Sequence, residues 1–162
     1  MADRKILLSI IFDNFDGLRL DDFPNRLKLQ KRMYLMQLFG LDLGYRFNWY
    51  IHGPYCPTLA DDAFELVQRP DIVRTGSSEF ELSEKAKSLL KKYKSLEKRL
   101  STYELIKSLE LAASIHYLKN IGFIPGGATK TNIRRALRSK GKNFAENEIQ
   151  NAWDSLKAFN LI

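Results

Sequence analysis

The segment YRFNWYIHGPYCP, residues 45–57, constrains the fold of this chain more than any other stretch. Large apolar and polar side chains alternate along its first seven residues, and this period of two predicts a β-strand with one buried face. The predicted buried face consists of Tyr45, Phe47, Trp49 and Ile51. The triplet His52-Gly53-Pro54 predicts a turn directly after the strand. Any fold of the chain therefore has to place this strand against a core that other elements supply.

Most of the remaining chain repeats its apolar residues at three- and four-residue steps, which predicts helices. The predicted helices cover residues 3–15, 25–40, 57–68, 83–96, 101–120, 131–139 and 144–159. Asn25 is expected to cap the second helix, and Ser101 and Glu104 have the spacing of a capping box. The second helix is apolar nearly all round in its later turns, so it is predicted to lie at the centre of the core.

A hairpin is predicted for DIVRTGSSEFEL, residues 71–82, because turn-forming residues interrupt two short extended patterns. The patterns together predict a mainly α fold with a few short strands, in the α+β class. The order of helices, strand and hairpin also fits a winged-helix arrangement. The helix before the hairpin carries three acidic side chains and no basic one, so DNA phosphates would repel it from the major groove.

The clearest break in the chain is IGFIPGGATK, residues 121–130, which holds three glycines and a proline. We therefore expect a helical domain with a small sheet over residues 1–122. Residues 123–162 are expected to form a two-helix extension packed on the same core.

Few side chains of this sequence are suited to covalent catalysis or metal binding. The two histidines are His52 and His116, and the one cysteine is Cys56. His116 shares a helix sector with apolar residues, which favours a core or edge position. A dyad of His52 with Cys56 would support a hydrolase, but no orienting third group is identifiable. Zinc needs three or four Cys or His ligands, so we expect no metal, no cofactor and no enzymatic activity.

The single cysteine fits a reducing compartment, and no apolar run approaches the roughly 20 residues that a membrane span needs. A cytoplasmic protein without membrane association is therefore expected.

Basic residues gather in the C-terminal part of the chain. Seven basic residues and no acidic one occur from Lys119 to Lys142. Such a block fits an anionic partner, and it also fits a solvated helix face. The residues expected to contact nucleic acid in the first case are Arg134, Arg135, Arg138, Lys140 and Lys142.

Cations also load the first two turns of the second helix, where they oppose the helix dipole. They are Arg26, Lys28, Lys31 and Arg32. Pairing with the acidic helix over residues 57–68 would explain them, and an acidic partner is the alternative.

Two motifs together resemble a known family. The stretches RLKLQKRMYLMQ and YRFNWYIHGPYCPTL are similar to the YwgA-like uncharacterised prokaryotic proteins and, more distantly, to the Panacea domain of SocA-type antitoxins. The resemblance covers roughly residues 25–120. It implies a small, mostly helical domain without established enzymatic chemistry and, for the antitoxin relatives, a protein partner. The motif residues expected to form a structural signature or a partner surface are Lys28, Gln30, Lys31, Tyr34, Trp49, Tyr50, His52, Gly53, Pro54 and Tyr55.

The leading hypothesis is a non-enzymatic, protein-binding module of prokaryotic type, in an antitoxin, defence or regulatory setting. Nucleic-acid binding through the basic helix at residues 131–142 is the second hypothesis. A hydrolase that uses His52 and Cys56 is the third.

Overall fold

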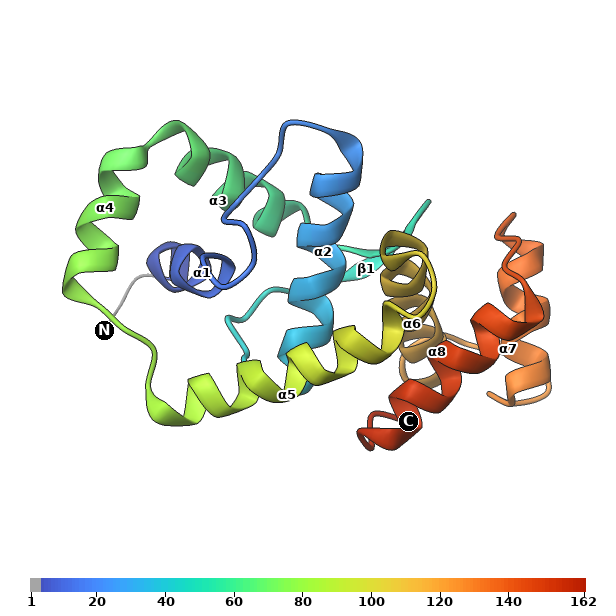
Figure 1. Cartoon of the computed structure of the whole chain (residues 1–162). Helices are drawn as coiled ribbons and strands as arrows, with labels where there is room; N and C mark the ends of the chain where they lie inside the picture. Colours follow the sequence, from blue (N-terminus) through green and yellow to red (C-terminus); the bar gives the residue numbers. More distant parts are fainter. Residues whose placement is uncertain (1–3) are drawn as a thin grey trace. The chain divides into compact units, whose positions relative to one another are not determined.

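The computed structural model describes residues 4–162, apart from the side chains of residues 74–78. Within this part of the chain, eight helices and a two-stranded antiparallel sheet confirm the predicted α+β class (Figure 1). The helices are α1 (Arg4–Phe12), α2 (Phe23–Leu38), α3 (Pro57–Gln68), α4 (Pro70–Glu79), α5 (Glu84–Leu100), α6 (Leu105–Asn120), α7 (Lys130–Ser139) and α8 (Glu146–Ala158). The strands are β1 (Asn48–Tyr50) and β2 (Gly53–Tyr55).

The chain forms two compact units. The N-terminal unit contains Met1–Asn48 and Tyr55–Tyr93, and the C-terminal unit contains Trp49–Pro54 and Lys94–Ile162. This partition differs from the expected boundary at residue 122, because residues 94–122 group with the C-terminal helices.

Helix α2 is central to the N-terminal unit, as its apolar turns predicted, with Met33, Leu35 and Met36 fully buried. Asp22 caps this helix by accepting a hydrogen bond from the Asn25 amide at 2.8 Å. The predicted cap at Asn25 is therefore wrong, because the cap lies three residues earlier and Asn25 belongs to the first turn of the helix. Helices α1, α3 and α4 pack against one another, and α3 also packs against α2.

The predicted hairpin over residues 71–82 is wrong, since Pro70–Glu79 forms helix α4. Pro70 is well suited to the first helical position, and Asp71 places a negative charge in the first turn. Packing of α4 against α1 and α3 then outweighs the turn preference of the glycine and serines. The helix also removes the wing on which the winged-helix comparison rested.

The predicted strand is shorter than expected, and its turn lies elsewhere. The structure places the turn at Ile51 and His52, and the Gly-Pro-Tyr triplet forms β2. Gly53 adopts a φ of 85°, which only glycine adopts readily. Ile51 is 84% exposed, so its predicted place on the buried face is wrong. At the apex of a two-residue turn, no neighbouring strand covers its side chain.

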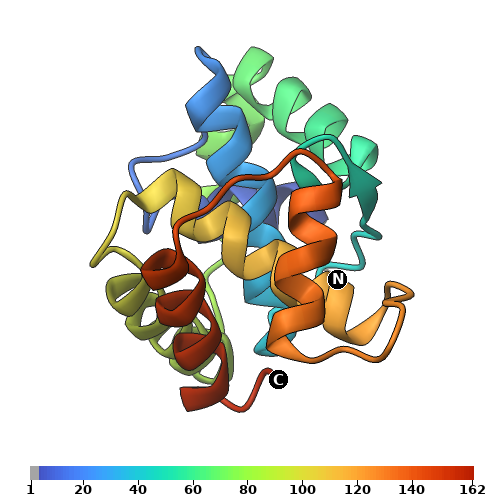
Figure 2. The same ribbon diagram turned by 90° about the vertical axis from the view of Figure 1, so that its right-hand side faces the viewer.

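Helix α6 is central to the C-terminal unit and buries residues on nearly all sides, while α7 and α8 pack against it (Figure 2). Glu104 is its N-cap, because the carboxylate accepts hydrogen bonds from the amides of Ile106 and Lys107. The expected cap, Ser101, instead donates to the carbonyl of Lys98.

The predicted start of the first helix at Asp3 lies outside the described residues. The end of that helix is at Phe12, three residues before the expected end. No helix in the described part of the chain combines the length and apolar character required to cross a bilayer.

Candidate functional site

The two sequence motifs meet in the N-terminal unit through the buried amide of Gln30. Its Nε2 donates to the Cys56 carbonyl at 3.0 Å, and its Oε1 accepts from the Cys56 amide at 2.8 Å. Cys56 immediately precedes α3, at a position whose own side chain makes no capping bond. Gln30 therefore holds the start of α3 against α2, which gives the paired motifs a structural role.

An open groove of about 610 Å³ lies beside Gln30. The loop after α1, helices α2 and α3, and Tyr55 form this groove. Its apolar lining consists of Leu18, Leu20, Leu29, Ala60, Phe64 and Val67. Its polar lining consists of Asp21, Arg26, Gln30, Tyr55 and Asp61. Gln30 and Tyr55 belong to the predicted partner surface, so each motif contributes a residue to the groove.

Helix α3 presents apolar side chains on two sides. Helical spacing in the sequence predicts inward positions for Leu59, Ala63, Leu66 and Val67, and the first three are buried. Phe64 is 59% exposed and Val67 is 47% exposed, one helical turn apart along the groove. The predicted inward position of Val67 is wrong, because this residue falls outside the stripe that packs into the core. Exposed apolar pairs of this kind are typical of interaction surfaces.

The edge of the groove has a partly compensated negative charge. A hydrogen bond from its own backbone, followed by the Arg19 guanidinium, lowers the pKa of Asp21. Arg26 donates to the carbonyl of Leu20 at 2.9 Å. Asp61 is exposed and forms no ion pair with any described residue. The groove therefore offers one uncompensated carboxylate to a cation.

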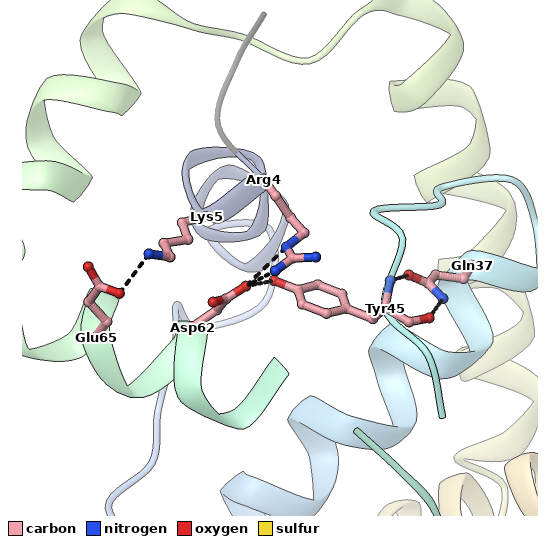
Figure 3. Close-up of polar contacts among 6 residues, drawn as sticks. All are labelled: Arg4, Lys5, Gln37, Tyr45, Asp62 and Glu65. Atoms are coloured by element: carbon pink, nitrogen blue, oxygen red, sulfur yellow. Dashed lines mark hydrogen bonds and ion pairs between the residues drawn. The ribbon is translucent and has the colours of Figure 1, made fainter. Parts of the chain in front are cut away.

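The other side of α3 is held by the N-terminal helix (Figure 3). Asp62 accepts from the Tyr45 hydroxyl at 2.8 Å and pairs with Arg4 at 3.0 Å. Glu65 pairs with Lys5 at 2.7 Å. Burial, followed by the Asp62 carboxylate, raises the pKa of Tyr45. Both of these ion pairs of α3 are made with α1, whereas pairing was expected with the basic first turns of α2.

A second cluster lies in the C-terminal unit around the tip of the hairpin. Lys142 Nζ donates to the Ile51 carbonyl at 2.7 Å and lies 3.6 Å from Glu110 Oε1. The same Glu110 oxygen lies 3.2 Å from His52 Nδ1. Lys142 is buried, which argues against its predicted contact with nucleic acid. Sequence reasoning missed this cluster because its members come from three segments with no shared local pattern.

Trp49, a residue of strand β1 in the same hairpin, contacts three side chains of the C-terminal unit. Its ring lies 5.7 Å from that of Tyr117, measured between centroids. The ammonium groups of Lys140 and Lys142 lie 5.2 and 5.9 Å from the Trp49 ring centroid. Such cation–π contacts hold the two lysines near the hairpin.

The exposed basic surface around α7 contains fewer of the five predicted cations than the sequence led us to expect. Arg134 pairs with Glu146, and Arg135 donates to Asn132 at 3.3 Å. Arg138 and Lys140 are exposed, as is Arg135. With Lys142 buried, these three exposed cations are the main part of the surface that remains open to an anion.

The other predicted motif residues range from buried to exposed. Tyr34 is buried and packs edge-on against Phe47, with ring centroids 5.2 Å apart. Lys31 and Pro54 are buried, and Lys28 is half-buried. Tyr50 and His52 are exposed at the hairpin.

The side chains considered for catalysis have different surroundings. The Cys56 thiol is 2% exposed, and neither Cys56 nor His52 lines the groove. His52 has an orienting carboxylate, Glu110, which sequence reasoning did not identify. His116 is half-buried, in agreement with an edge position, and its burial lowers its pKa to about 4.

No group of three or more His, Cys, Asp or Glu side chains among the described residues is placed to hold a metal ion. No family model matches the chain, and neither a curated protein nor a solved structure matches it. The resemblance to the YwgA-like proteins and the Panacea domain therefore rests on the motifs alone and stays a prediction.

Proposed function

We propose that this protein is a non-enzymatic, protein-binding module whose groove in the N-terminal unit takes up apolar side chains of a partner. The observation that carries the proposal is the exposure of Phe64 and Val67 along an apolar groove of about 610 Å³. Covering such side chains is favourable by about 25 cal/mol per Å² of apolar surface. A partner that fills the groove therefore removes surface that water solvates poorly.

The charge at the edge of the groove defines which polar side chain the partner should carry beside its apolar ones. Asp61 has no cationic partner among the described residues, so a lysine or arginine beside the partner's apolar side chains would pair with it. The proposed ligand is thus a protein segment with apolar anchors and a neighbouring basic residue.

The cellular setting proposed for this module is a prokaryotic cytoplasm, in an antitoxin, defence or regulatory role. The paired Lys-Leu-Gln-Lys and Gly-Pro-Tyr motifs support this setting by resemblance. Binding through an apolar groove requires no catalytic group, which agrees with a role that depends on docking.

Selection from a displayed peptide library on the purified full chain tests the proposal. We expect enriched peptides to carry two apolar residues and at least one Lys or Arg. Phe64→Ser should weaken their binding about tenfold or more, because it removes an apolar wall of the groove.

Phe123→Ser is a matched control, because Phe123 is 89% exposed but belongs to the C-terminal unit. Asp61→Asn should weaken only the basic peptides and reduce their salt dependence. Peptides that bind both phenylalanine variants as well as the native chain would contradict the proposal.

Nucleic-acid binding is the second candidate, favoured by the charge of the C-terminal unit. This unit has twelve basic and six acidic residues, and Arg135, Arg138 and Lys140 are exposed on it. Retention on duplex DNA and RNA should then fall steeply with salt. An Arg134/Arg135/Arg138→Ala triple variant should lose most of the retention. Retention that is weak at low salt, or unchanged in the triple variant, would reject this candidate.

A further inference from the structure

The hairpin tip presents an apolar side chain to solvent. Ile51 is 84% exposed at the apex of the turn, and Tyr50 and His52 on either side of it are also exposed. An isolated exposed isoleucine is common on protein surfaces and needs no explanation by itself. The way in which the rest of the C-terminal unit holds this turn is the additional observation.

Two residues distant in sequence fix the tip. Lys142, a buried lysine, directs its ammonium to the Ile51 carbonyl at 2.7 Å. Glu110 faces the His52 ring at 3.2 Å and the Lys142 ammonium at 3.6 Å. The turn is therefore preorganised, and a rigid knob loses little conformational entropy when it binds.

The surroundings of the tip are basic, whereas the groove has an acidic edge. Lys140 is exposed beside Trp49 of the same hairpin, within a unit that has twelve basic and six acidic residues. The groove carries the carboxylates of Asp61 and Asp21 and the cation of Arg26; Asp21 pairs with Arg19, so Asp61 is the carboxylate left without an ion-pair partner in the described part of the chain. Tip and groove are thus complementary both in apolar character and in charge.

We propose that the hairpin tip, residues 50–52, of one copy of this chain occupies the groove of a second copy. Ile51 fills the apolar space along Phe64 and Val67, and basic side chains near the tip approach Asp61. This inference rests on the proposed function of the groove and names the ligand. A membrane is a poorer partner for the tip, because one isoleucine between a tyrosine and a histidine buries little apolar surface.

The contact is heterologous, since each copy offers one tip and one groove. The native chain should therefore associate increasingly with concentration in sedimentation-velocity experiments, from low micromolar to near-millimolar protein. Association should weaken at high salt, because salt screens the attraction between the basic tip and the acidic edge.

Two complementary variants of the full chain isolate the contact. Ile51→Asp removes the apolar knob, and Val67→Asp places a charge in the groove; both positions are exposed, so far-UV circular dichroism should stay native. Each variant alone should associate about tenfold or more weakly than the native chain. An equimolar mixture should form a 1:1 dimer and nothing larger, because only one intact tip can meet one intact groove.

Phe123→Ser is the matched control, since it removes another exposed apolar side chain of the same unit and should leave association unchanged. Any of three results overturns the inference: a native chain that is monomeric throughout, a mixture that does not dimerise, or loss of association in Phe123→Ser. Vesicle binding that is lost in Ile51→Asp while the native chain stays monomeric would assign the tip to a membrane instead. If the chain is monomeric but the groove still selects peptides, this inference fails and the proposed function stands.

Discussion

The central helices of the two units, α2 and α6, differ in whether their buried polar side chains form hydrogen bonds. In α2, Gln30 uses both ends of its amide to hold the backbone of Cys56. In α6, the buried hydroxyl of Ser114 has no hydrogen-bond partner among the described residues, and neither has that of Ser155 on the adjoining α8. The first helix uses polarity to position a neighbouring element, whereas the second tolerates polarity where a small side chain lets two helices pack closely.

The largest effect on stability is expected from Gln30→Ala, which removes the two hydrogen bonds that α2 makes to Cys56 in the N-terminal unit. It leaves the buried amide and carbonyl of Cys56 without partners, so the free energy of unfolding should fall by about 2–4 kcal/mol. Chemical denaturation followed by circular dichroism measures this loss.

Gln37→Ala is the matched control for that experiment. Gln37 makes the same two bonds, to the backbone of Tyr45, but it is only partly buried, so water can replace them. A loss in Gln37→Ala equal to that in Gln30→Ala would show that burial does not distinguish the two amides.

In the C-terminal unit, Glu110→Ala should lower the free energy of unfolding by about 2 kcal/mol. The substitution leaves the buried Lys142 ammonium without its carboxylate. Tryptophan fluorescence is the suitable probe, because both tryptophans, Trp49 and Trp153, belong to this unit. Glu146→Ala removes a more exposed ion pair with Arg134 and should cost less than about 1 kcal/mol. Equal losses in the two variants would contradict the role given to the buried lysine.

Tyr45→Phe removes a hydroxyl that donates to the buried carboxylate of Asp62. We expect a loss of about 1–2 kcal/mol, less than for Gln30→Ala, because Arg4 still pairs with Asp62. Thermal unfolding of this variant beside Tyr103→Phe, at a half-buried tyrosine of the C-terminal unit, provides the measurement. A variant as stable as the native chain would mean that this bond contributes nothing net.

Acidification should destabilise the fold through His116, whose folded-state pKa is lowered from 6.5 to about 4 by burial. The unfolded chain binds its proton first as the pH falls below 6.5, so the stability that the neutral ring confers above that pH is lost towards pH 4. Allowing for the partly exposed ring, we expect a loss of about 1 kcal/mol. Denaturation of the native chain and of His116→Gln at several pH values isolates this contribution. Free energies of unfolding that change with pH in the same way in both proteins would contradict it.

The smallest effect, and the one opposite in sign, is expected from Ser155→Ala. Removing a buried hydroxyl without a partner should stabilise the fold by about 0.5–1 kcal/mol. Ser139→Ala, at an exposed hydroxyl that bonds to the Ala136 carbonyl, should change stability little. Destabilisation by Ser155→Ala would indicate that this hydroxyl is satisfied in solution, and the contrast with Gln30 of α2 would then not hold for this residue of α8.

Much of the fold could be predicted from local pattern. The helix Pro57–Gln68 has the predicted bounds, and the central place of α2 follows from its apolar turns. The helix Pro70–Glu79 could not be predicted in this way, because its packing against α1 and α3 overrides a sequence that favours a turn. Exposure of Ile51 was also missed, since a period of two predicts a face but not where the strand ends.

The candidate site was only partly predictable. Gln30 and Tyr55 were identified within motifs, although their shared groove depends on the path of the loop after α1. Phe64 and Val67 could have been recognised as a second apolar side of α3, since both lie outside the stripe of buried residues. The contact between Glu110 and Lys142 joins segments that only the tertiary fold brings together, so no spacing in the sequence reveals it.

The interleaved order of the two units restricts how this gene could be divided. Six residues of the C-terminal unit, Trp49–Pro54, are encoded within the N-terminal unit, and α5 continues through the second boundary after Tyr93. No single cut produces a fragment that contains all of one unit and none of the other. Truncation mapping, the usual way to assign an activity to half of a protein, would therefore not separate the two units cleanly, and point substitutions are the appropriate tool for this chain.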